Sequence, residues 1–186
     1  LMILLSTFLV FGIVLTFYLT STSISGLTSS LPLNYQAEVC VYKTPWLGDS
    51  YGEKEFVSCS HNLLYNQGAN MTRDLLGGGS SGTIRNISLC NATAGCAAIN
   101  VGASEAFTAV PGCGLASVAG SYAVVATSAG NWSIYNTFTS TCLSTTTTNL
   151  TRLTNGTGSI FAGNTFTLVS LENNDQLTVN WTIMVT

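Results

Sequence analysis

The N-terminal part of the chain is almost continuously apolar. Residues 1–19 read LMILLSTFLVFGIVLTFYL, and no charged residue occurs before Glu38. A helix of this sequence would be hydrophobic on every face. At about 1.5 Å per residue it would be about 30 Å long, which is the thickness of the hydrocarbon core of a bilayer. We therefore predict a long hydrophobic N-terminal α-helix, followed by a Ser/Thr/Gly-rich hinge over residues 20–30.

Beyond the hinge, hydrophobic and polar residues alternate. Residues 177–185 (LTVNWTIMV) put Val179 and Trp181 on one face and Asn180 on the other, which is typical of a half-buried strand. Residues 165–170 alternate in part, and the Asn-Asn-Asp sequence between the two runs favours a turn. We therefore expect an antiparallel hairpin at the C-terminus, with any sugar on Asn180 projecting from its polar face.

Several other short runs predict strands, and Gly, Asn and Pro separate them at short intervals. They are residues 37–42, 55–59, 82–89, 97–101, 104–110, 121–126 and 131–137. Regular short strands with frequent turns indicate a β-sandwich, and the one other helical pattern is a single turn at 61–64. The low-complexity stretches 77–82 (GGGSSG) and 144–149 (STTTTN) are typical of loops. The predicted fold class is α+β, with a helix and hinge over residues 1–30 and an all-β domain over residues 31–186.

The composition indicates a polar surface with few charges. Only 7% of the 186 residues are charged, 46% are hydrophobic, and the formal net charge is -3. An ordinary soluble domain has about 25% charged residues, yet the apolar content here is sufficient for a folded core. The five cations are scattered along the chain, at Lys43, Lys54, Arg73, Arg85 and Arg152. This distribution argues against nucleic acid as a partner.

The cysteines indicate a disulfide-bonded chain. Six occur, all beyond the apolar stretch: Cys40, Cys59, Cys90, Cys96, Cys113 and Cys142. None forms a CxxC pair, and the lone histidine, His61, does not complete a zinc-ligand spacing, so we expect neither a metal site nor a cofactor. Disulfides require an oxidising environment or the cytosol of a hyperthermophile. We expect sequential pairing, Cys40 with Cys59, Cys90 with Cys96, and Cys113 with Cys142.

Seven N-x-S/T sequons predict N-linked glycans. They begin at Asn70, Asn86, Asn91, Asn131, Asn149, Asn155 and Asn180, and none has Pro in its middle position. A Ser/Thr-rich chain also produces sequons by chance, so this alternative stays open for some of them. Together with the cysteines, the sequons indicate a chain that crosses a membrane and is glycosylated outside the cell.

Two groups of residues have the residue types of a catalytic site without its context. Ser80 lies in a G-x-S-x-G sequence, but that motif requires Asp and His downstream, and His61 lies upstream. Glu53 and Glu55 form the closest carboxylate pair, and Lys54 between them indicates a solvated strand edge. The chain also lacks a glycine-rich phosphate loop. We therefore predict that it is not an enzyme.

Three interpretations of the apolar stretch compete. A secretory signal peptide would have a basic n-region, a shorter apolar run and an A-x-A cleavage site, and this stretch has none of them. A single-pass anchor fits the length, although no Lys or Arg flanks either end to fix its orientation. A self-association helix would wait in the membrane and then pack against copies of itself.

The order of these segments resembles that of archaeal type IV pilins and archaellins. An uncharged apolar helix (1–19), a hinge (20–30, TSTSISGLTSS) and a β-rich body follow one another. The start at Leu1 agrees with the short basic leader that precursors of this family lose just before the helix. Bacterial type IV pilins have glutamate at the fifth position of the mature helix, where this chain has Leu5, so the resemblance is to the archaeal branch. It implies an immunoglobulin-like sandwich.

The resemblance also implies a function. The chain would be a structural subunit that self-assembles into an extracellular helical filament for adhesion or motility. The polymerisation helix would contact identical subunits through Leu1, Ile3, Leu4, Leu5, Phe8, Leu9, Phe11, Gly12, Ile13, Leu15 and Phe17. Further partners would be the membrane before assembly and the ATPase and platform of pilus assembly. Two alternatives, a membrane-anchored adhesion domain and a viral envelope glycoprotein, stay open because the apolar stretch suits all three.

Overall fold

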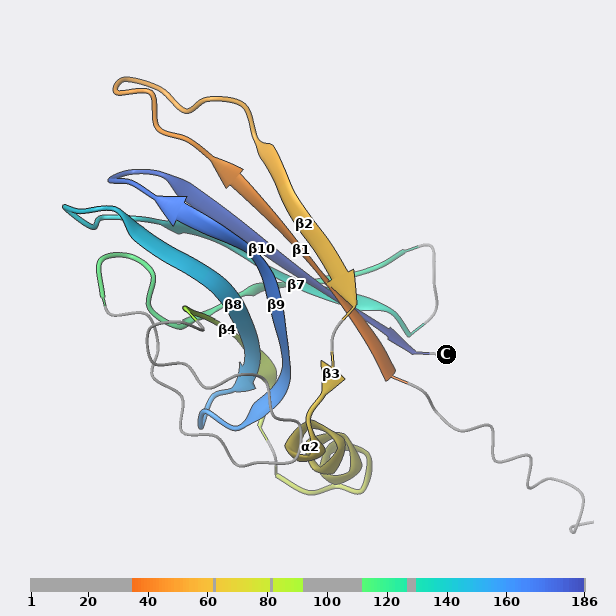
Figure 1. Ribbon diagram of the computed structural model, residues 1–186. Coiled ribbons are helices and arrows are strands. Elements are labelled where there is room, and N and C mark those ends of the chain that lie inside the picture. Colours follow the sequence, from red (N-terminus) through yellow and green to blue (C-terminus); the bar gives the residue numbers. More distant parts are fainter. Residues whose placement is uncertain (1–34, 62, 81, 92–111, 127–129, 186) are drawn as a thin grey trace, which may run out of the picture. The chain divides into compact units, whose positions relative to one another are not determined.

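The structure is a computed structural model that describes residues 35–61, 63–80, 82–91, 112–126 and 130–185 (Figure 1). The chain divides into two compact units, Leu1–Leu33 and Asn34–Thr186, and the described residues belong to the second. The predicted helix and hinge, and the strands predicted at 97–101 and 104–110, therefore lie outside the described residues. Within the described residues, no helix is long and apolar enough to cross a bilayer.

Five strands form the first antiparallel sheet. In chain order they are β1 (Tyr35–Thr44), β2 (Glu55–His61), β6 (Ser121–Val124), β7 (Trp132–Thr139) and β10 (Gln176–Val185). Their order across the sheet is β2-β1-β10-β7-β6, so β10 lies in the middle, next to β1. The register places Asn180 of β10 opposite Cys40 of β1 on one side and opposite Tyr135 of β7 on the other.

The second sheet is also antiparallel and has five strands. They are β3 (Leu63–Leu64), β4 (Ile84–Cys90), β5 (Val118–Ala119), β8 (Thr146–Asn155) and β9 (Ile160–Leu171), in the order β3-β9-β8-β4-β5. The one helix of the described residues, α2 (Asn66–Leu76), follows β3 and packs against β9. A Cβ atom at Gly68 would collide with the carbonyl oxygen of Phe161, so glycine allows the helix to approach the sheet closely.

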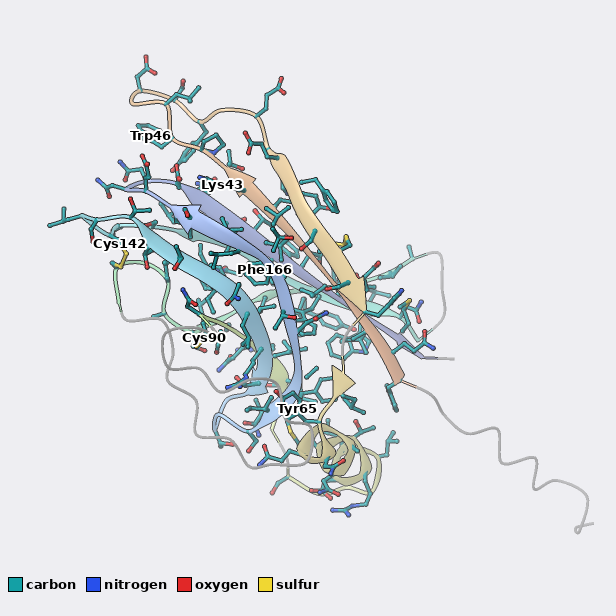
Figure 2. The ribbon with its side chains drawn as sticks, in the orientation of Figure 1. Lys43, Trp46, Tyr65, Cys90, Cys142 and Phe166 are labelled. Carbon is teal, nitrogen blue, oxygen red and sulfur yellow. A yellow bond between two sulfur atoms is a disulfide. The ribbon has the colours of Figure 1, made fainter. Side chains whose placement is uncertain are left out.

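The two sheets enclose one hydrophobic core (Figure 2). Val179 and Trp181 enter it from the first sheet, and Leu153 and Phe161 enter it from the second. The alternation predicted for β10 is confirmed, because its odd-numbered residues from 177 to 183 are fully buried and the residues between them are partly exposed. The indole Nε1 of Trp181 donates a hydrogen bond of 3.4 Å to Oγ1 of Thr151 on β8, which links the two sheets.

The predicted α+β class is wrong for the part of the chain that the structure describes. These residues form two antiparallel sheets with one short helix, and none of them belongs to a long apolar helix. They are an all-β sandwich. The expected immunoglobulin-like topology is also wrong, because its last strand lies at a sheet edge, whereas β10 lies between β1 and β7. That expectation rests on the family resemblance, since alternation predicts strands but not their order.

The predicted C-terminal hairpin does not form. Strands β9 and β10 are consecutive in the chain, but β9 pairs with β8 and β3, and β10 pairs with β1 and β7. Both strands turn their apolar side chains into the same core from opposite sides. The turn between them is as expected, and Asn174 has a positive φ of 68° there, a conformation that asparagine tolerates better than most residues.

Two other local predictions are corrected. The stretch 144–149 is not a loop throughout, because β8 begins at Thr146. Thr148 in this strand is buried, and its hydroxyl donates a hydrogen bond of 2.8 Å to the carbonyl oxygen of Cys90. The helical turn expected at 61–64 is also wrong, because His61 ends β2 and Leu63–Leu64 form β3 before α2 begins at Asn66.

Candidate functional site

A hollow of about 280 Å³ lies on the outward face of the first sheet. We call it the tyrosine hollow. It is lined by Tyr42 of β1, Lys54 just before β2, Ser133 and Tyr135 of β7, and Thr178 and Asn180 of β10. The register explains the arrangement, because Tyr42 pairs with Thr178 and Tyr135 pairs with Asn180. The polar side chains of β10 therefore lie between two tyrosines that come from the strands on either side.

The lining of the tyrosine hollow combines aromatic rings with hydrogen-bond donors. The Lys54 Nζ atom lies 4.5 Å from the centroid of the Tyr42 ring, and that ring meets Phe56 edge-on with centroids 5.8 Å apart. The hydroxyls of Thr178 and its neighbour Thr137 are hydrogen-bonded at 2.9 Å. Such a lining suits a ligand that has both C–H faces and hydroxyl groups.

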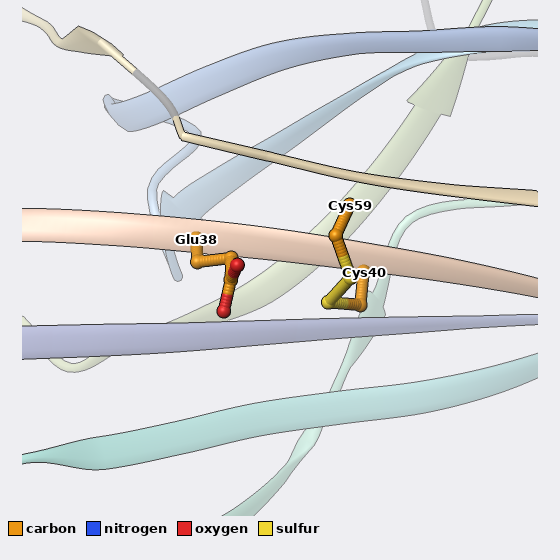
Figure 3. A group of neighbouring side chains, drawn as sticks. All are labelled: Glu38, Cys40 and Cys59. Carbon is orange, nitrogen blue, oxygen red and sulfur yellow. A yellow bond between two sulfur atoms is a disulfide. The ribbon is translucent and has the colours of Figure 1, made fainter.

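A disulfide lies beside this hollow on the same sheet. Cys40 and Cys59 are directly opposite residues of β1 and β2, with their Cα atoms 4.1 Å apart, and they are bonded as predicted. Figure 3 shows the carboxylate of Glu38 next to this disulfide. Among the described residues, Glu38 and these two cysteines are the group with metal-ligating side chains close together. Because the two sulfur atoms are bonded to each other, the group offers one carboxylate and cannot hold a metal ion as thiolates would.

A second disulfide ties the loop before β5 to the segment after β7. It joins Cys113 to Cys142, again as predicted, with Cα atoms 4.9 Å apart. Cys90 is also disulfide-bonded, and its predicted partner, Cys96, lies outside the described residues. These disulfides indicate an oxidising environment, such as that of an extracellular or secreted protein.

The predicted glycosylation sites are spread over the sandwich. Asn70 on α2 is exposed, whereas Asn86 on β4, Asn91 after β4, Asn131 before β7, Asn149 on β8 and Asn180 on β10 are half-buried. Asn180 lies on the polar face of its strand, as predicted, and it lines the tyrosine hollow. Whether these asparagines carry glycans stays a prediction.

The remaining sequon asparagine, Asn155, is the last residue of β8 and is buried. It is only 4% exposed. Its Oδ1 atom accepts hydrogen bonds from the backbone N–H groups of Thr157 (3.1 Å) and Ser159 (2.8 Å), and from the Thr157 hydroxyl (2.8 Å). This is the pattern by which an asparagine side chain stabilises a turn, so the side chain has a structural role that a sugar would disturb.

Asp175 joins three segments near the start of β10. Its carboxylate accepts hydrogen bonds from the backbone N–H groups of Trp46 (2.8 Å) and Glu172 (3.0 Å), and it pairs with the Lys43 Nζ atom at 2.9 Å. Burial alone would raise the pKa of Asp175, but the two backbone N–H groups and the Lys43 ammonium together lower it below its usual value. Asp175 and its partners therefore form a charged structural clamp. The sequence predicted only a turn at this position.

The residues considered for catalysis do not come together in the described part of the chain. Ser80 lies in the exposed loop after α2 and lines a hollow with Asp74, whereas His61 lines a different hollow at the end of β2. Glu53 and Glu55 are both exposed. Neither group forms a nucleophile with an adjacent base.

Sequence reasoning missed the tyrosine hollow because its residues come from four separate segments. The one local signal was the position of Asn180 on the polar face of β10. The tyrosines gave no such signal, since an isolated aromatic residue in a strand is as common in a core as on a surface. In comparisons with known proteins, no protein-family model, no curated protein and no solved structure matches this chain.

Proposed function

We propose that the chain is the structural subunit of an extracellular filament and that it polymerises through the apolar stretch of residues 1–19. The observation that carries the proposal is the absence of any charged residue before Glu38. Each Leu, Ile, Val or Phe of the stretch gains about 1.5–3 kcal/mol when it leaves water for an apolar environment. The stretch must therefore be covered by lipid or by other apolar segments.

The β-sandwich has a hydrophobic core of its own. Trp181, Leu153 and Leu177 are fully buried among side chains that the two sheets supply. The described strands therefore supply a core of their own. This supports a role for the apolar stretch in contacts with identical subunits rather than in the sandwich.

Growth into a filament requires a head-to-tail contact that does not close into a ring. The apolar stretch can be buried in lipid or against the same stretch of other subunits. The free energy of apolar burial is nearly equal in the two environments, so close packing between the stretches determines which is more stable. Small residues such as Gly12, Ser6 and Thr16 are where apolar segments approach closely. Such a filament would carry its apolar stretches inside and its sequon-bearing sandwiches outside. As the resemblance to pilins implies, an ATPase and a membrane platform would build it, for adhesion or motility.

The substitution Gly12→Lys in the full-length chain tests the proposal. An unpaired ammonium in a packed apolar interior costs several kcal/mol, and the cost recurs in every subunit. We therefore expect electron microscopy of the cell surface and medium to show no filaments, while the chain is still produced with its disulfides formed. Ser23→Lys is the matched control, because it adds the same charge in the polar hinge, and it should still assemble.

Two outcomes would contradict the proposal. If a chain that begins at residue 31 still formed filaments, the subunit contacts would run through the sandwiches. If the full-length chain stayed in membranes as a monomer, the stretch would be a membrane anchor. The uncharged apolar stretch also suits that alternative, an anchored adhesion domain.

A further inference from the structure

Three aromatic rings lie together on the mostly polar outward face of the first sheet. The outward residues around the tyrosine hollow include Ser133 and Thr178, but Tyr42, Phe56 and Tyr135 lie among them. Phe56 is 62% exposed and Tyr135 is 45% exposed. Aromatic rings grouped on a surface leave apolar area in water unless a ligand covers them.

Asn180 lies between the two tyrosines of this group. Tyr135 is its direct partner across the sheet, and Tyr42 lies diagonally on the other side, opposite Thr178. The Oδ1 atom of Asn180 is buried and receives no hydrogen bond from any described residue. Asn180 also begins a sequon, Asn-Trp-Thr. A residue that can be glycosylated therefore lies inside an aromatic hollow.

We propose that the saccharide linked to Asn180 folds back into the tyrosine hollow and that its first ring packs between Tyr42 and Tyr135. One face of a pyranose ring presents C–H groups with partial positive charge, which the negative faces of aromatic rings attract. Its hydroxyls can hydrogen-bond to the Lys54 ammonium and the Ser133 hydroxyl, which line the same hollow. The hollow of about 280 Å³ holds the first ring, and the rest of the glycan extends into solvent.

Attachment requires a saccharide phosphate donor and a glycosyltransferase of the cell. A bond forms between sugar C1 and Asn180 Nδ2, and the bond between C1 and the phosphate oxygen breaks. That oxygen leaves with the bonding electron pair, and Nδ2 loses one proton. The step involves no oxidation or reduction.

The inference rests on the predicted glycosylation of Asn180 and not on the polymerisation that the proposed function describes. Peptide mapping by mass spectrometry reports whether Asn180 is occupied, whereas electron microscopy reports whether filaments form. An unoccupied Asn180 in a chain that forms filaments would overturn the inference and leave the proposed function intact.

Tyrosine nitration of the full-length, detergent-solubilised glycoprotein tests the packing itself. The chain is produced in a host with N-glycosylation, treated with tetranitromethane, and analysed by peptide mass spectrometry. Because the sugar ring would cover Tyr135, we expect this residue to react several-fold faster in Asn180→Gln than in the glycosylated chain. Tyr51, which is 44% exposed and does not line the hollow, is the internal reference and should react at one rate in both.

A second sequon provides the matched control. Asn70 also lines a hollow, of about 390 Å³, but none of the described residues that line it is aromatic. Asn70→Gln should therefore leave the nitration rate of Tyr135 unchanged. In addition, Asn180→Gln should lower Tm by about 2–4 °C when Tyr135 is present and have little effect in Tyr135→Ala. Equal nitration rates of Tyr135 with and without the Asn180 glycan would overturn the inference.

Discussion

Removing the carboxylate of Asp175 should destabilise the sandwich strongly. The side chain of Asp175 is 5% exposed, and that of its partner Lys43 is 24% exposed. In Asp175→Ala, the backbone N–H groups of Trp46 and Glu172 lose a charged acceptor, and each such hydrogen bond is worth about 1.5–3 kcal/mol. Water can replace part of this loss because the site is near the surface. We therefore expect a decrease of about 3 kcal/mol in the free energy of unfolding.

Two further variants separate the contributions to this clamp. Asp175→Asn keeps one acceptor oxygen but points an amide N–H₂ group at a donor, so about half of the loss is expected. Lys43→Met removes the ion pair with Asp175 and the 2.9 Å hydrogen bond that Lys43 Nζ donates to the carbonyl oxygen of Ser170. Because Lys43 is partly exposed, solvent screens the ion pair and can replace the hydrogen bond, and we expect a cost of at most about 1 kcal/mol.

Guanidinium unfolding with the disulfides intact measures these differences, with the fluorescence of the buried Trp181 as one probe. Asp49→Ala is the control, because Asp49 lies in the exposed loop between β1 and β2 and should change stability by less than about 0.5 kcal/mol. Equal effects of Asp175→Ala and Asp49→Ala would refute the structural role of the clamp. If Lys43→Met cost as much stability as Asp175→Ala, the conclusion that the backbone hydrogen bonds contribute most of the stability of the clamp would be wrong.

Three other predictions follow from single observations. The folded pKa of Asp175 is lowered, so its stabilisation is present above the unfolded pKa of about 3.9 and is lost as the pH falls through the folded pKa. In thermal unfolding below about pH 4, the wild type should therefore lose more stability than Asp175→Asn. Gly68→Ala should cost about 1–3 kcal/mol because its Cβ collides with β9, whereas Gly156→Ala, with open space around it, should have a small effect in the same assay. Peptide mapping should find Asn155 largely without glycan and Asn70 occupied, because Asn155 is 4% exposed; full occupancy of Asn155 would contradict this order.

Strand positions could be predicted where polar and apolar residues alternate, because a half-buried strand imposes a period of two. Strands β1, β2, β4, β6 and β7 overlap the runs expected at 37–42, 55–59, 82–89, 121–126 and 131–137. Pairing could not be predicted in this way. Strands β9 and β10 would bury the same side chains whether they formed a hairpin or lay in different sheets. Which arrangement forms depends on β1, which lies far upstream in the chain and pairs with β10.

The candidate site was beyond sequence reasoning for a related reason. Lys43 and Asp175 form one clamp, and Tyr42 and Tyr135 line one hollow, although each pair is far apart in the chain. Long-range pairings of this kind follow from sheet register, which a one-residue slip would change. The burial of Arg152 could not be predicted either. The sequence shows Arg152 only as one of five scattered cations, whereas in the structure it is fully buried on β8.

Strand β8 shows why a chain with few charges is difficult to interpret from hydropathy. Thr148 and Thr151 are fully buried, and their hydroxyls are hydrogen-bonded to a backbone carbonyl and to the Trp181 indole. A hydropathy pattern counts threonine as polar, so the stretch 144–149 is interpreted as a loop. Yet the β-branched side chain suits a strand, and a satisfied hydroxyl removes most of the cost of burial. Because the same residue type serves in the core and on the surface of this sandwich, hydrogen-bond partners, more than hydropathy, distinguish the two faces of such strands.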